Sequence, residues 1–176
     1  MPHQREAFCD RAELLARLDD LGIAHETMDH PAVFTVEEAE NHTGHLPGGH
    51  CKSLFLKDKK GGLWLLVCLD RRRIDMNSLA KTLGSPRLSF GKPDLLMTTL
   101  GVAPGSVTPF ALINDGDHQV RPILDKAMLD YEVLNYHPLT NEATTTIKSP
   151  DLSVFIQAMG HEPIVIDLDA TGIDRS

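Results

Sequence analysis

The sequence predicts an α+β domain built around a mainly antiparallel sheet, and three observations favour this fold class. Two apolar runs, 52–57 and 63–69, flank the polar, glycine-containing stretch 58–62, which is typical of a β-hairpin. Helix-capping residues stand directly before several of the remaining segments. The predicted strands and helices also follow one another without the regular alternation that indicates a parallel sheet.

Helix signals occur at several places along the chain. Apolar residues at helical spacing predict an amphipathic helix over 5–21. Thr35 and Glu38 form a capping-box pattern that opens a short helix over 35–42. The other expected helices, each opened by a cap or a proline, are 75–84, 92–100 and 149–160.

Strands are expected where apolar or β-branched residues form short runs bounded by turn residues. Besides the two runs of the hairpin, the expected strands are 23–28, 110–113, 120–124, 132–136, 144–147 and 163–168. No internal repeat, low-complexity tract or long linker divides the chain. The 176 residues are therefore expected to form one domain, 1–176.

Composition limits the class of protein and its compartment. No run of about 18 apolar residues is present, so neither a membrane span nor a membrane partner is expected. The N-terminus lacks the apolar centre of a signal peptide. The three cysteines are scattered and form no CxxC pair. The simple interpretation is a reduced, cytoplasmic protein.

The charge is unevenly distributed along an acidic chain. The net charge is −8, which by itself argues against a nucleic-acid partner. The stretch 52–92, however, contains ten lysines and arginines against three aspartates, a local charge of +7, so the rest of the chain carries −15. A solvated, charged hairpin and a modest phosphate-binding surface both explain this basic stretch.

Two short motifs carry the chemistry that the sequence suggests. The run CKSLFLKDKK, 51–60, places Lys52 at the start of an apolar strand, where a charge is costly unless it has a partner. The run LGVAPGSVTPF, 100–110, is a loop stiffened by prolines, whose glycines allow close approach of a ligand. A fixed cation and a loop of donor amides are what ester hydrolysis needs to stabilise an oxyanion.

Together these motifs resemble the YbaK-like family of aminoacyl-tRNA editing domains, and within it the free-standing prolyl-tRNA editing proteins. The resemblance extends from about His30 to Asp167 and includes the runs RRID at 72–75, LGSPRLSF at 83–90 and NYHP at 135–138. It implies a curved, mixed, mainly antiparallel sheet flanked by helices. It also implies a cytoplasmic hydrolase that needs no metal or cofactor and removes alanine mischarged onto proline tRNA.

The resemblance assigns roles to individual residues. Lys52, Gly105 and His137 are expected to be catalytic, Lys52 by electrostatic stabilisation and His137 by orienting water or substrate. The loop residues expected to bind the aminoacyl group are Ser106, Val107, Thr108 and Pro109. Apolar residues chosen for their neighbourhood along the chain are expected to complete that pocket: Ile23, Met28, Val33, Phe34 and Leu54. Three residues of the basic stretch, Lys59, Arg71 and Arg72, are expected to bind tRNA. Prolyl-tRNA synthetase is a further expected partner.

Other interpretations remain open. His42, His45 and His50 suggest zinc, but they lie in a glycine-rich stretch that no cysteine or carboxylate pair completes. No G-x-S-x-G pattern indicates a serine nucleophile. Within the family, the substrate is alternatively a cysteine or serine ester. Outside it, the chain is alternatively a non-catalytic module that binds tRNA or a synthetase.

Overall fold

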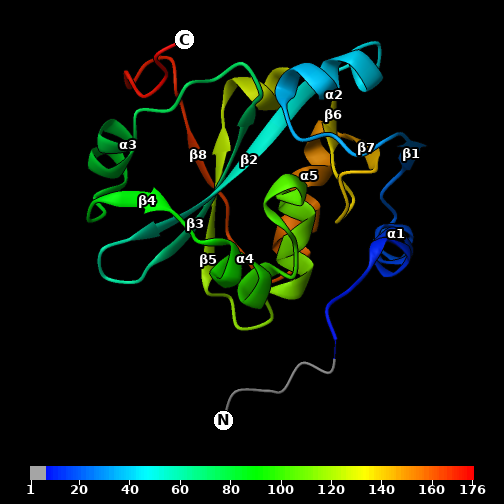
Figure 1. Ribbon diagram of the computed structural model, residues 1–176, viewed down its shortest axis with the longest axis horizontal. Helices are drawn as coiled ribbons and strands as arrows, with labels where there is room; N and C mark the ends of the chain where they lie inside the picture. Colours follow the sequence, from blue (N-terminus) through cyan, green and yellow to red (C-terminus); the bar gives the residue numbers. More distant parts are fainter. Residues whose placement is uncertain (1–6) are drawn as a thin grey trace.

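The computed structural model describes residues 7–176, and within them eight strands form one mixed sheet (Figure 1). The strand order is β1-β7-β6-β2-β3-β5-β8, with the short β4 paired to β2. The strands are β1 (His25–Asp29), β2 (Gly49–Asp58), β3 (Leu63–Leu69), β4 (Leu88–Phe90), β5 (Val120–Asp125), β6 (Val133–Tyr136), β7 (Ala143–Lys148) and β8 (Ile164–Ile166).

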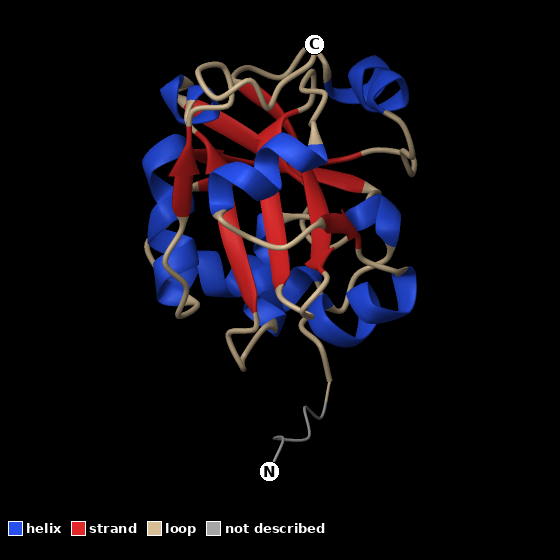
Figure 2. Ribbon diagram, turned by 90° about the vertical axis from the view of Figure 1, so that its left-hand side faces the viewer, coloured by secondary structure: helices blue, strands red, loops and turns tan. Residues whose placement is uncertain are grey.

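Antiparallel pairing predominates in this sheet. The antiparallel pairs are β1–β7, β6–β7, β2–β3 and β2–β4, whereas β2–β6, β3–β5 and β5–β8 are parallel. Figure 2 shows the helices arranged around the strands. The predicted α+β class, with a mixed and mainly antiparallel sheet flanked by helices, is therefore confirmed.

Five helices lie within the described residues, and four of them begin where the capping signals predict. They are α1 (Arg11–Asp20), α2 (Val36–Thr43), α3 (Met76–Leu83), α4 (Pro93–Leu100) and α5 (Ser149–Ala158). At α2, the Thr35 side chain accepts a hydrogen bond from the Glu38 amide (3.1 Å), and the Glu38 carboxylate accepts one from the Phe34 amide (3.1 Å). The α1 helix begins later than the predicted 5–21, because Asp10 is its N-cap. Residues 5 and 6 of that prediction lie outside the described residues.

The strand predicted at 110–113 is wrong. This segment belongs to a 3-10 helix, η2 (Pro109–Asn114), whose N-cap Thr108 accepts a hydrogen bond from the Phe110 amide (3.3 Å). Its apolar residues are buried as a strand's would be, so hydrophobicity alone does not separate the two structures. The other 3-10 helices within the described residues are η1 (Pro104–Ser106) and η3 (Ala127–Asp130).

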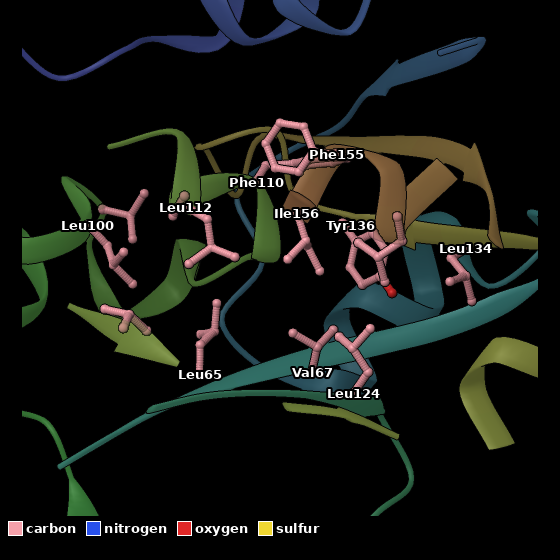
Figure 3. Packing of buried hydrophobic residues seen from close by; sticks show 14 of the residues in the cluster. Leu65, Val67, Leu100, Phe110, Leu112, Leu124, Leu134, Tyr136, Phe155 and Ile156 are labelled. Atoms are coloured by element: carbon pink, nitrogen blue, oxygen red, sulfur yellow. The ribbon is translucent and has the colours of Figure 1, made fainter. Parts of the chain in front are cut away.

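The core lies on both faces of the sheet. Along β3 the side chains alternate: Leu65 and Val67 enter the larger cluster, whereas Leu66 and Cys68 enter the smaller one. Figure 3 shows Phe110, Tyr136 and Phe155 within the larger cluster. The Phe110 ring meets Tyr136 and Phe155 edge to face, with centroids 5.8 and 5.4 Å apart. This packing anchors the segment that follows the loop 101–108.

The sheet brings three strand ends together at one place. The start of β2 pairs with the end of β3 (Lys52 opposite Cys68) and lies parallel to β6 (His50 opposite Asn135). Gly48 permits this close approach: its φ is +92°, and a Cβ there would lie 2.2 Å from the Val133 carbonyl oxygen. Helix α2 lies beside this end of β2 (Figure 1). Within residues 7–176, no helix has the length and apolar character needed to cross a membrane.

Candidate active site

A cleft opens at the start of β2. Its first part, here called the lysine pocket, has a volume of about 180 Å³ and is lined by Lys52, Phe34, Gly105 and Val107 among others. A neighbouring pocket of about 380 Å³ is lined by His50, Arg71 and other residues. The two pockets share the walls Val36, Ala39, Cys51, Asp70, Tyr136 and His137, so they form one cleft.

Lys52, which lines the lysine pocket, is held in place by a hydrogen bond and by strand pairing. It is half-buried, and its ammonium group donates a hydrogen bond to the backbone carbonyl of Arg72. Strand pairing with Cys68 fixes its backbone. An ammonium group has three N–H donors, so two remain for a ligand in the pocket.

That carbonyl is fixed in turn by the buried side chain of Arg72. The guanidinium, 0% exposed, donates to both carboxylate oxygens of Asp125 (3.0 and 3.2 Å) and to Asp174 (2.7 Å). It also pairs with Asp169 (3.0 Å from Nη2). The prediction that Arg72 binds tRNA is therefore wrong, because its guanidinium is enclosed by carboxylates instead of facing solvent.

Gly105 forms part of the opposite wall. A Cβ at this position would lie 3.1 Å from the Asn141 side-chain nitrogen and 3.4 Å from the Phe34 ring, so a larger residue would crowd the pocket. Gly105 lies in the first turn of η1, where backbone N–H groups have no partner within the helix. The Ser106 amide, in contrast, donates to the Ala103 carbonyl (2.9 Å).

The rest of the predicted loop divides into lining and supporting residues. Val107 lines the pocket. Ser106, Thr108 and Pro109 are buried, and none of them is among the residues that line the cleft. These three residues therefore stiffen the loop, as the cap that Thr108 provides for η2 illustrates.

His137 stands at the end of β6, between the two pockets. Its Nδ1–H donates to the Ala143 carbonyl (3.0 Å), so in the neutral ring Nε2 carries the lone pair. Burial lowers the pKa of His137 from its ordinary 6.5, and the nearby His30 acts in the same direction. The ring is therefore neutral at pH 7, able to accept a hydrogen bond at Nε2.

The His30 imidazole adjoins His137 and the His42 imidazole adjoins His30, and sequence reasoning did not place these residues together. The His30 ring centroid is 6.3 Å from that of His137 and 6.1 Å from that of His42. Nδ1–H of His30 donates to the Pro31 carbonyl (2.8 Å), and its Nε2 forms a hydrogen bond with the Thr144 hydroxyl (2.8 Å). Their positions in different loops and helices gave no local sequence signal.

Asp70 is the other residue that sequence reasoning missed. It is half-buried in the wall shared by both pockets, directly after β3. Burial raises the pKa of its carboxyl group, although the charges of His50 and Lys52 oppose this. An acidic residue immediately after a buried strand was the available signal, because such residues often emerge at a sheet end beside a ligand site.

Of the five predicted pocket walls, two line the cleft and three do not. Val33 and Phe34 line the lysine pocket, and the Phe34 side chain is 75% exposed at its mouth. Ile23 is buried in the larger core cluster instead. Met28 lies on β1 opposite Thr144, outside the cleft lining, and Leu54 packs against the smaller core cluster. The hydrophobicity of Ile23 and Leu54 therefore serves packing of the core.

The basic residues separate into different regions. Arg71 is exposed and lines the neighbouring pocket, whereas Lys59 lies at the far end of β2. His50 donates from Nε2 to the Leu46 carbonyl (3.0 Å). Among residues 7–176, no group of three or more His, Cys, Asp or Glu side chains is arranged to hold a metal ion.

The cleft thus combines a fixed ammonium, a backbone turn with an unpaired N–H, and a neutral imidazole. A cation and N–H donors facing one cavity can stabilise the negative charge that develops on a carbonyl oxygen during acyl transfer. A neutral imidazole can orient a water or a hydroxyl group. The arrangement suits hydrolysis of an ester without a side-chain nucleophile.

Comparisons with a family model and with known proteins agree on one family. Residues 30–155 match the aminoacyl-tRNA editing domain. Prolyl-tRNA synthetase associated domain-containing protein 1 of Mus musculus is 43% identical over 164 residues, which cover 90% of this chain and 96% of that protein. The prolyl-tRNA editing protein ProX of Acetoanaerobium sticklandii is 33% identical over 156 residues, covering 88% of this chain and 95% of ProX.

Solved structures show the same fold. One described as a trans-editing enzyme for prolyl-tRNA synthetase superposes with a TM-score of 0.69, covering 92% of this chain and 98% of that chain. Its sequence identity to this chain is 22%, so this similarity supports a shared fold only.

Proposed function

Because the chain belongs to the aminoacyl-tRNA editing domain family, we propose that it is a deacylase that acts in trans on alanine mischarged onto proline tRNA. The observation that carries this proposal is the convergence of Lys52, Gly105 and His137 on one cleft. The three residues come from different elements, and all three line the lysine pocket.

The geometry of the cleft supports the following proposed roles. Lys52 and the amide at Gly105 stabilise the oxyanion that forms when water adds to the ester carbonyl. His137 Nε2 accepts a hydrogen bond from that water or from the free hydroxyl of the terminal ribose. The tetrahedral intermediate then collapses, the ester oxygen of the ribose leaves and takes up a proton, and free alanine and tRNA result. Positioning and electrostatics supply the rate.

Specificity is proposed to come from size exclusion. The lysine pocket is small, about 180 Å³, and it must also admit part of the terminal ribose. Gly105 and Phe34 leave little space between the loop and the neighbouring segment 33–35. A larger side chain such as that of proline is rejected by overlap, and the alanyl methyl group is admitted. Such a second sieve supplies discrimination that a synthetase's own apolar pocket lacks.

The direct test is release of amino acid from proline tRNA charged with alanine, serine or cysteine. Release of alanine fastest of the three, with equal rates before and after prolonged chelation, is the expected result. Faster release of serine or cysteine would assign a different substrate within the family. Binding of every charged tRNA without release would indicate a non-catalytic module and contradict the proposed activity.

The pH dependence of the deacylation rate should follow the protonation state of His137. Protonation removes the Nε2 lone pair, so the rate should fall as pH drops through a midpoint below 6.5, because burial lowers the pKa of this imidazole. His137→Gln should lower the rate at pH 7 and lose this acid limb. The matched control is His45→Gln, since His45 is an exposed histidine outside the cleft lining. A midpoint above 6.5, or the same limb in His137→Gln, would remove His137 from the reaction.

A further inference from the structure

A second hollow lies at the other end of β2. This basic groove has a volume of about 780 Å³ and runs between the turn after β2, strand β4 and helix α4. Four cations line it: Lys57, Lys59, Arg87 and Lys92. All four side chains are exposed. None of them forms an ion pair with another described residue.

The acidic residues of the groove do not cancel this charge. Asp58 is buried, and its carboxylate accepts hydrogen bonds from the amides of Lys60 (2.8 Å) and Gly62 (2.9 Å) and from the Trp64 indole (3.2 Å). It is therefore turned into the hairpin. Asp94 lies in the first turn of α4, where the helix dipole favours a negative charge. The chain has a net charge of −8, so a cluster of four cations without ion pairs makes this groove locally positive on an acidic protein.

The groove has a rigid frame. Lys57 pairs with Ser89 in the β2–β4 ladder, and the Lys59 amide donates to the Arg87 carbonyl (3.1 Å). The backbones that carry three of the cations are thereby fixed relative to one another. The next residue of β4, Phe90, lines the same groove with its ring 64% exposed. Cations beside an exposed aromatic ring are the combination that binds a nucleic-acid strand, phosphates by charge and bases by stacking.

The groove and the cleft are connected by one strand. Side chains alternate along β2, so Cys51 and Ser53 at the cleft lie on the same face as Lys57 at the groove. From Lys52 to Asp58 the strand rises by roughly 20 Å at about 3.3 Å per residue. The loop 101–107, which lines the cleft, continues from α4, which lines the groove. A single nucleotide does not span this distance, but a polynucleotide does.

We propose that this groove binds the sugar–phosphate backbone of the substrate tRNA, upstream of the terminal nucleotide whose ester lies in the cleft. The inference rests on the proposed function, because the cleft defines which RNA is held. This proposal locates the phosphate-binding surface that the basic stretch 52–92 suggested. Lys59 lines the groove together with Lys57, Arg87 and Lys92, whereas Arg72 does not. Counterion release from phosphates supplies the affinity.

The test compares two substrates and two double variants. Arg87→Glu with Lys92→Glu reverses two groove charges. Arg17→Glu with Lys148→Glu makes the same change in net charge at exposed positions on α1 and β7. Each protein is assayed on alanylated full-length proline tRNA and on an alanylated oligonucleotide of a few nucleotides that ends in the same sequence. Thermal unfolding confirms that both variants are folded.

For the groove variant, KM on full-length tRNA should rise at least fivefold while kcat stays within twofold. The short substrate, which does not reach the groove, should be hydrolysed at the wild-type rate. An equal rise in KM for the control variant, or an equal loss on the short substrate, would overturn the proposal.

Binding of uncharged tRNA, followed by fluorescence anisotropy, separates this proposal from the proposed activity. The groove variant should bind at least fivefold more weakly than wild type and depend less steeply on salt, whether or not the protein hydrolyses the ester. Unchanged affinity and salt dependence would overturn the groove assignment and leave the activity to be judged by its own assay.

Discussion

Replacing Lys52 by alanine should lower deacylation at least tenfold, which corresponds to about 1.4 kcal/mol or more in the activation barrier. The ammonium group lines the small pocket and has two N–H donors left after its bond to the Arg72 carbonyl. Its loss removes the fixed positive charge next to the developing oxyanion. Lys52→Met separates charge from bulk, because it keeps an unbranched side chain of similar length, and it should be equally impaired.

The matched control is Lys126→Ala. Lys126 is also a lysine at a strand end, following β5, but it is exposed and outside the cleft. Single-turnover kinetics on alanylated tRNA should show wild-type rates for this control, and circular dichroism should show native spectra for all three variants. A well-folded Lys52→Met enzyme with a wild-type rate would exclude Lys52 from the reaction.

Arg72→Met should destabilise the fold by about 3–5 kcal/mol, the usual cost of removing one partner from a buried ionic network. The guanidinium joins Asp125 at the end of β5 to Asp169 and Asp174 near the C-terminus. Without it, Asp125, which is 0% exposed, is left as a buried carboxylate without a cation. Urea unfolding measures the loss, and the neighbouring Arg73→Met, at an exposed site, should change the free energy of unfolding by less than about 0.5 kcal/mol.

The same network predicts a difference in acid sensitivity. Burial alone would raise the pKa of Asp174, but hydrogen bonds from Arg72, Ser176 and the Arg73 amide outweigh it and hold the pKa well below its ordinary value of 3.8. A lowered folded-state pKa contributes stability above the unfolded value, and this contribution is lost as pH falls below about 3.8 towards the folded value. Wild type should lose this stability in that range. Arg72→Met should lack most of that contribution already at pH 7, so its free energy of unfolding should change less between pH 7 and pH 3. A variant with the same free energy of unfolding as wild type at pH 7 would contradict a stabilising role for the network.

Local signals predicted the regular elements well because capping and turn chemistry act over a few residues. Thr35, Asp75 and Pro93 stand at the helix starts that the sequence indicated. The hairpin at 58–62 was equally clear. The strand prediction for 110–113 was wrong because apolar residues there would be buried in either conformation. Thr108 caps this segment and Pro109 occupies its first turn, and both favour a 3-10 helix. Strand β4 has only three residues and depends on pairing with β2.

Some residues of the candidate site were likewise predictable from local motifs, and others were not. Lys52, Gly105 and His137 were recognised from motifs, and the fold brings them to one cleft. Arg72 was misplaced because its sequence context, a run of three arginines, does not distinguish the buried one from its exposed neighbours. Its acidic partners lie 53 to 102 residues away along the chain. Strand order, which no local pattern specifies, brings Asp70 to the cleft and His30 beside His137.

The most direct measurement compares hydrolysis of alanyl and prolyl esters on the same proline tRNA. A stiff pocket that excludes by size should cleave the alanyl ester at least tenfold faster, since overpacking costs about 1–3 kcal/mol. Phe34→Ala, which opens the space beside Gly105, should reduce this ratio by accelerating prolyl release before alanyl release declines. Equal rates for the two esters in the wild-type protein would contradict both size exclusion and the proofreading role.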